Sequence, residues 1–213
     1  MVTVEADLVH VESRLAAGQI VCPVCPDGVL GGWGFARVRR IHGVAGPVRP
    51  RRARCRSCLV THVLLSVRTL LRRGYAAQII WDALALRARG WGHRRIADKL
   101  GTPGATVRGW LRRAAGRAEP LRTWFLQVAV GTGIDVEIPD GAGCGWVDLV
   151  AAIVTAAAAI RTRFGPVGVL GVVTPPLVMV AVSSSQLLAP VWPPAVRRGE
   201  QHQLPLTRNP RVR

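Results

Sequence analysis

The sequence predicts a mainly α chain with a small β unit at its N-terminus, a three-helix unit, and a helical C-terminal region that ends in an irregular tail. Two Cys-x-x-Cys pairs within residues 22–58 predict the β unit. Helical periodicity over 76–115 predicts the three-helix unit, and apolar helical repeats continue until proline and glycine become frequent after 164. The predicted segments are 1–66, 67–118, 119–164 and 165–213.

The cysteine pairs, Cys22-Pro-Val-Cys25 and Cys55-Arg-Ser-Cys58, predict a zinc ribbon over 1–66. Each pair can form a turn that directs two sulfurs to a common point, and two such turns complete a tetrahedral thiolate site for Zn²⁺. Four thiolates leave no open position on the ion, so the zinc would be structural and would supply folding free energy. A redox pair would require a strand-to-helix context, and a disulfide framework conflicts with a reducing compartment and with an odd total of five cysteines. We interpret Cys144 and His62 as ordinary residues.

The segment between the two pairs predicts an arginine-rich β-ribbon. "PDGVLGGWG" is typical of a turn, and "FARVRRI" and "VRPRRAR" are short β-compatible runs around a turn at 42–47. Asp27 is the single acidic residue between the pairs. We therefore interpret Arg51, Arg52 and Arg54 as phosphate contacts, with a solvated charged face as the alternative.

Helical periodicity over 76–115 predicts a helix-turn-helix. Gly92 is an acceptable N-cap for a short helix that ends at Gly101. Thr102 is a good N-cap for the next helix, because Pro103 then occupies the position where a missing N–H does no harm. One apolar stripe on this second helix would face the core, namely Val107, Trp110, Leu111 and Ala114.

The outer face of the second helix has the composition of a recognition helix. Small residues at its start allow close approach to base edges, and arginine can bind guanine through two hydrogen bonds. Arginines at the start of the preceding helix would lie near the DNA backbone. The candidate DNA contacts of this unit are Arg94, Arg95, Thr102, Gly104, Ala105, Thr106, Arg108, Arg112 and Arg113. The alternative is a plain three-helix bundle with an arginine-rich surface.

These motifs together carry a resemblance. "CPVC … RRARCRSCLVTHVLL … GWGHRRIADKLGTPGATVRGWLRR" resembles actinobacterial proteins that combine a zinc ribbon with a helix-turn-helix. They form a domain-of-unknown-function family that is described as transposase-like and is found with insertion sequences. "RAEPLR", "AAAAIRTRFGP" and "SSSQLLAP" extend the similarity over most of the chain. The resemblance implies DNA recognition in a mobile-element setting and no assigned chemistry.

Charge and acidic residues narrow the functional class. The chain has 29 basic and 12 acidic residues, and a formal net charge of +17. That balance predicts a polyanionic partner, either nucleic acid or an anionic membrane surface. A transposase would need three carboxylates that hold two Mg²⁺ ions. The candidate acids after the helix-turn-helix are Asp135, Glu137, Asp140, Asp148 and Glu200, and the first four crowd into one glycine-rich stretch. We therefore expect no enzyme and no catalytic residue.

The C-terminal third predicts helices over 120–130 and 146–164. The second is apolar on both sides, so it either packs back on the helix-turn-helix or forms a dimer or partner interface. Residues 164–196 are uncharged, but Pro175-Pro176 and four further prolines argue against a membrane span. The N-terminus lacks a signal-peptide pattern, which favours a cytoplasmic, nucleoid-associated protein.

The combined expectation is a DNA-binding protein with a zinc-dependent fold that serves as the recognition component or regulator of a transposable element. Its expected partner is double-stranded DNA, with a second copy of the chain or a separate transposase subunit as further partners and no membrane. The alternatives are a transcriptional regulator, a truncated transposase with residual nuclease activity at Asp135 or Asp148, and an interaction protein that arginines merely solubilise.

Overall fold

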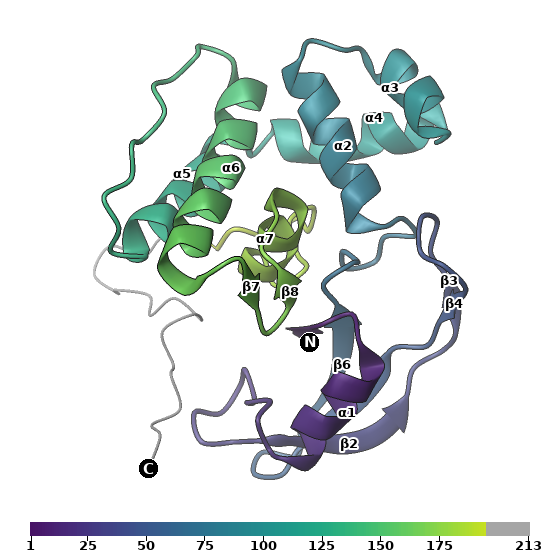
Figure 1. Cartoon of the computed structure of the whole chain (residues 1–213). Helices are drawn as coiled ribbons and strands as arrows, with labels where there is room; N and C mark the ends of the chain where they lie inside the picture. The colour runs from purple at the N-terminus through teal and green to yellow at the C-terminus, as the bar shows by residue number, and fades with distance from the viewer. Residues whose placement is uncertain (195–213) are drawn as a thin grey trace.

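A four-stranded sheet covered by one helix forms the N-terminal part of the computed structural model, which describes residues 1–194 (Figure 1). The strands lie in the order β1-β6-β5-β2, with β1 parallel to β6 and the other pairs antiparallel. The helix is α1 (Leu8–Ala16), and the strands are β1 (Val2–Val4), β2 (Leu30–Phe35), β5 (Arg51–Cys55) and β6 (Thr61–Ser66). Val11 and Leu15 of α1 pack on Leu30, Ala53 and Leu64 of the sheet in a small core of their own.

The arginine-rich segment between the cysteine pairs forms the predicted hairpin and also an unpredicted strand. β3 (Arg39–Arg40) pairs with β4 (Pro47–Val48) around the expected turn. The predicted turn "PDGVLGGWG" includes "LGGWG", but these residues form β2 together with Phe35. Leu30 is fully buried and pairs with Cys55 of β5, and the glycines that follow Leu30 continue the pairing with Arg54 and Ala53.

Three helices follow the sheet close to their predicted bounds: α2 (Ala77–Ala88), α3 (His93–Leu100) and α4 (Gly104–Ala115). Gly92 is the N-cap of α3, and Gly101 ends that helix with a left-handed φ of 58°, which glycine adopts without strain. The stripe predicted for α4 is its buried face. The predicted Thr102 cap is wrong: Pro103 is the N-cap, and the Thr102 hydroxyl donates to the carbonyl of Leu100 at 3.2 Å.

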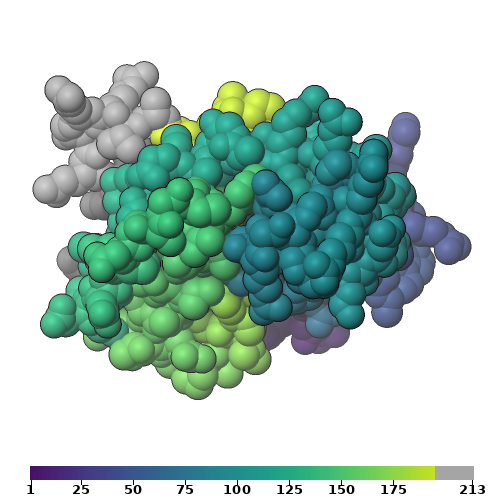
Figure 2. Space-filling view, turned by 90° about the horizontal axis from the view of Figure 1, so that it is seen from above, coloured from purple at the N-terminus to yellow at the C-terminus, as the bar shows by residue number. Residues whose placement is uncertain are grey.

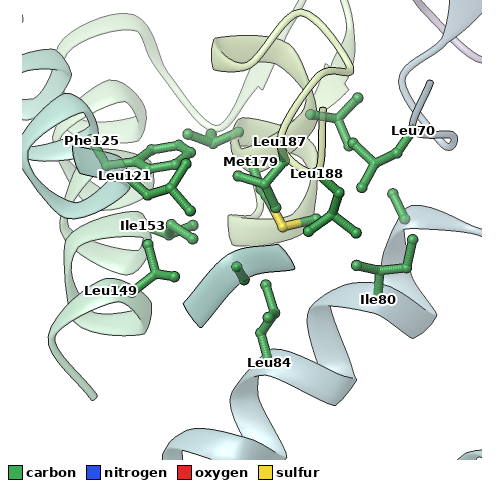
Figure 3. Packing of buried hydrophobic residues seen from close by; sticks show 14 of the residues in the cluster. Leu70, Ile80, Leu84, Leu121, Phe125, Leu149, Ile153, Met179, Leu187 and Leu188 are labelled. Atoms are coloured by element: carbon green, nitrogen blue, oxygen red, sulfur yellow. The ribbon is translucent and has the colours of Figure 1, made fainter. Parts of the chain in front are cut away.

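The remaining helices pack with the first three around one core (Figure 3). They are α5 (Ala118–Gly131), α6 (Gly145–Phe164) and α7 (Pro175–Val182), with the hairpin β7 (Val167–Gly168)–β8 (Gly171–Val172) before α7. Leu84, Phe125, Ile153 and Met179 bring α2, α5, α6 and α7 together. Helices make up 43% and strands 18%, so the fold is mixed α/β rather than mainly α.

The C-terminal segment corrects the prediction of an irregular tail for 165–213. Prolines occupy the first positions of α7, where they need no N–H partner, and the Thr174 hydroxyl caps the helix by accepting from the N–H of Leu177. Leu187, Leu188 and Trp192 are buried in the helical core. The Arg117 guanidinium donates to the carbonyls of Leu187, Ala189 and Trp192. The segment is therefore part of the fold as far as Trp192, and 195–213 lie outside the described residues.

The apolar helix α6 packs against the other helices, which is one of the two arrangements that the sequence analysis expects for it. Leu149, Ala152, Ile153 and Ala156 are fully buried, whereas Val154 is exposed on the opposite side. Within the part of the chain that the structure describes, α6 is also the one helix long and apolar enough to cross a membrane by length and composition. Self-association through its exposed side stays a prediction.

Candidate metal centre and nucleic-acid surfaces

Four cysteine sulfurs converge at one end of the sheet. Their Sγ atoms all lie within 4.8 Å of one another, with Cys22 3.8 Å from Cys58 and Cys25 3.4 Å from Cys55. Zn–S bonds of about 2.3 Å in a tetrahedron place neighbouring sulfurs about 3.8 Å apart. The donor set and its spacing therefore fit a four-thiolate metal site, which is consistent with structural Zn²⁺.

Both cysteine turns are built to hold sulfur close to backbone N–H groups. The N–H of Val24 donates to Cys22 Sγ at 3.4 Å, and the N–H groups of Ser57 and Cys58 donate to Cys55 Sγ at 3.4 Å each. These donors stabilise thiolates over thiols, which favours metal binding. Each turn is thus prepared for its ligands by local backbone geometry.

Gly28 is the residue that lets the two turns meet. A Cβ at this position would lie 2.2 Å from Cys25 Sγ and 2.6 Å from Cys55 Sγ, closer than any real contact. Its carbonyl accepts from the N–H of Cys22 at 2.7 Å, which closes the first turn. The packing of the sulfurs therefore requires glycine here, whereas the sequence predicts this residue only as part of a turn.

The electrostatics of the cluster distinguish its members. Burial opposes ionisation of Cys55, yet the N–H groups of Cys58 and Ser57 lower the pKa of its thiol to about 6. The side-chain hydrogen bond to Cys55, and burial after it, raise the pKa of Cys25 to about 12. The backbone N–H groups at Cys55 therefore favour a thiolate in this pair, the form that binds a metal ion.

His62, which the sequence analysis interprets as an ordinary residue, lies beside the cluster. The side chain is 3% exposed, with Nε2 3.6 Å from Cys22 Sγ and Nδ1 2.9 Å from the amino group of Met1. Burial lowers the pKa of its imidazole, followed by the charge of that amino group. Strand alternation could have predicted that His62 is buried, because it shares its sheet face with the buried Leu64. Cys144 is exposed at the N-cap of α6 and is not a member of the cluster.

The α3–turn–α4 unit exposes most of the predicted DNA contacts. Ala105, Arg108 and Arg112 are exposed and lie three to four residues apart, on one face of α4. Gly104 and Thr106 are partly exposed beside them. In Figure 2, the teal atoms of this part of the chain lie at the molecular surface.

Burial or a local contact restricts three of the predicted contacts on this unit, namely Thr102, Arg113 and Arg95. Thr102 is 5% exposed, so its side chain is not part of the surface, and that assignment is wrong. Arg113 is exposed, but its guanidinium donates to the carbonyl of Gly109 at 2.9 Å. Arg94 and Arg95 are exposed on α3, and the Arg95 guanidinium lies 3.7 Å from the centre of the Trp91 ring.

The three arginines predicted on the ribbon do not form one surface. Arg51 lies on the α1 side of the sheet, where it pairs with Glu12 at 2.5 Å and donates to the carbonyl of Gly34 at 2.8 Å. Arg52 and Arg54 alternate with the buried Ala53 and Cys55, so they project from the opposite face. Arg51 is thus already paired with Glu12 and separated from the other two arginines, and its role as a phosphate contact stays a prediction.

The acidic residues near α6 are not gathered into a site. Asp135, Glu137 and Asp140 are exposed in the segment between α5 and α6, and Asp148 accepts from the N–H of Ala142 at 2.7 Å. Within residues 1–194, the cysteine cluster is the one group of three or more His, Cys, Asp or Glu side chains close enough to share an ion. Glu200 lies outside the described residues.

Comparison of the chain with protein-family models, with curated proteins and with solved structures found no match of any of the three kinds. The fold and the cysteine site together define the chain as a mixed α/β protein with a four-cysteine centre.

Proposed function

We propose that this chain is a sequence-specific DNA-binding protein that inserts α4 into the major groove of duplex DNA. The observation that supports this most directly is the outer face of α4, where Ala105, Arg108 and Arg112 stand exposed on one side of the helix. A helix of 12 residues is about 18 Å long, enough to present these positions along a groove about 12 Å wide.

Charge and local structure support the same surface. No acidic residue occurs from Lys99 to Ala118, and neither Arg108 nor Arg112 forms an ion pair within residues 1–194. The αL turn at Gly101 holds α3 against α4, as in helix-turn-helix proteins, where the first helix crosses the DNA backbone. Arg94 and Arg95, on α3, would then contact phosphates.

In this proposal the cysteine centre has a structural role. Bound Zn²⁺ would fix the Cys22–Cys25 turn, which precedes β2, to the Cys55–Cys58 turn, which joins β5 to β6. This would order the sheet, because its small core includes Cys22 and Cys55 themselves. The ordered sheet would hold Arg52 and Arg54 against the DNA backbone. Action at the ends of a transposable element is the setting that the family resemblance implies, and action at promoters is the alternative.

The test is a titration of labelled duplex DNA with zinc-loaded protein at several salt concentrations. The affinity falls as salt rises, and each lost phosphate contact makes the slope of log K against log salt less steep by about 0.9. Arg94→Ala is expected to reduce the steepness by that amount. Arg161→Ala removes the same charge from the C-terminal end of α6 and is the matched control, which should leave the slope unchanged. Equal effects of the two variants would refute the assignment of this surface.

A further inference from the structure

Strand β2 exposes two aromatic side chains at the open edge of the sheet. Trp33 is 51% exposed and Phe35 46% exposed, and both follow glycines in the run Gly31-Gly32-Trp33-Gly34-Phe35. β2 is the last strand in the order β1-β6-β5-β2, so no further strand of this sheet covers it. Large aromatic side chains with this exposure on a sheet edge are candidates for a binding surface.

Arginine side chains lie over both rings. The Arg54 guanidinium is 4.6 Å from the centre of the Trp33 ring, and those of Arg49 and Arg51 are 5.0 and 4.7 Å from that of Phe35. One guanidinium lies against the Trp33 ring, whereas two lie against the Phe35 ring and cover more of it. Trp33 is therefore the ring with more of its π surface available.

The position of the arginine beside Trp33 is fixed by the chain itself. Arg54 Nε donates to the carbonyl of Leu59 at 3.0 Å, which holds the guanidinium in place. Arg56 lies over Gly31, where an added Cβ would come within 3.3 Å of Arg56 Nε. Gly31 and Trp33 are on the same face of β2 by alternation, so the glycine leaves room for an arginine next to the indole.

The surface around Trp33 carries uncompensated positive charge. Arg52 and Arg56 are exposed, and Arg52 projects from the same face of the sheet as Arg54. Within residues 1–194, none of Arg52, Arg54 and Arg56 forms an ion pair, and Glu12 is engaged by Arg51 on the other face. We call Trp33, Arg52, Arg54 and Arg56 the Trp33 patch.

We propose that the Trp33 patch binds single-stranded nucleic acid, with an unpaired base stacked on Trp33 and the flanking phosphates at the three arginines. Exposed aromatic rings interleaved with basic side chains are the usual means of binding unpaired strands, since every base offers a π face. A duplex keeps those faces stacked inside the helix, so the patch would select unpaired over paired strands. The patch lies on the sheet and not on α4; Arg52 and Arg54 belong also to the proposed duplex surface, whereas Trp33 serves the unpaired strand alone.

The test compares zinc-loaded variants by fluorescence anisotropy with a labelled thymidine oligomer of about 15 nucleotides, which spans one site. Trp33→Ala is expected to weaken binding by about 5- to 150-fold, the range for loss of one base–aromatic stack. Phe164→Ala is the matched control, because Phe164 is a comparably exposed ring with Arg163 5.7 Å from its centre on another element. That control should leave the affinity unchanged.

Further arms separate stacking from folding and from duplex binding. Trp33→Leu keeps an apolar side chain and should lose affinity as Trp33→Ala does, with zinc content equal to wild type. Arg108→Ala should retain single-strand binding, so that failure of the α4 proposal and failure of this one give different results. Equal affinities for Trp33→Leu and wild type would overturn the inference. Self-association of the Trp33 variants without loss of strand binding would also overturn it, because the arginine-covered ring would then only protect the sheet edge.

Discussion

Substitution of Gly28 by alanine tests the geometry of the cysteine centre without removing a ligand. The added methyl would lie 2.2 Å from Cys25 Sγ and 2.6 Å from Cys55 Sγ, whereas ordinary Cβ contacts begin at 3.4 Å. Each sulfur would have to move by about 1 Å, several times the tolerance of about 0.2 Å on a metal–ligand distance. We expect Gly28→Ala to weaken zinc binding by at least about 100-fold, or about 2.7 kcal/mol, the upper end for substitutions that only disturb the surroundings of a ligand.

Competition of the protein with a chromophoric chelator for zinc measures this change. Gly74→Ala is the matched control, because nothing lies within 4 Å of a Cβ at that position and its φ is not in the left-handed region. The control should bind zinc as wild type does. Wild-type zinc affinity in Gly28→Ala would refute the proposed packing of sulfurs around one ion.

Three further outcomes follow from the same structure. Cys55→Ser should disorder the sheet and leave the helices folded, since the helical core and the sheet core share no buried residue. Circular dichroism should then show a loss of β signal with the helical signal retained. Loss of both signals would contradict this prediction. Acidification should release the metal, because each thiolate ligand takes up a proton as the pH falls; zinc released to an indicator dye should rise toward low pH, and release on alkalinisation would contradict the thiolate site. Arg117→Ala should lower the free energy of unfolding by about 1–3 kcal/mol, because the carbonyls of Leu187, Ala189 and Trp192 lose their donor. Thermal unfolding measures this change. Arg122→Ala is the control, because the Arg122 side chain pairs with the exposed Glu119.

The sequence was sufficient for features that depend on local spacing. The cysteine pairs predicted the metal cluster because each turn is set by four consecutive residues. Gly92 and Gly101 predicted the bounds of α3, and the apolar stripe predicted the buried face of α4. In each case, the physical cause lies within one turn of the chain.

Features that depend on distant partners were missed or misassigned. The glycine-rich "LGGWGF" resembles a turn, but Leu30 is buried against Cys55, and the glycines leave room for the side chains of Arg51 and Arg56. The proline-rich segment after 165 resembles an irregular tail, but its apolar residues complete the core that Arg117 helps to close. His62 meets Cys22 only because the sheet brings them together.

The most direct test of sequence-specific recognition by α4 is selection from random duplex fragments with zinc-loaded protein, followed by sequencing. The account predicts an enriched motif for the wild type. Arg108→Ala should relax the motif at one position, at a loss of about 1–3 kcal/mol, whereas Arg52→Ala should weaken binding to all sequences alike. Recovery of duplexes without any motif, or the same motif from Arg108→Ala at wild-type strength, would contradict recognition by α4.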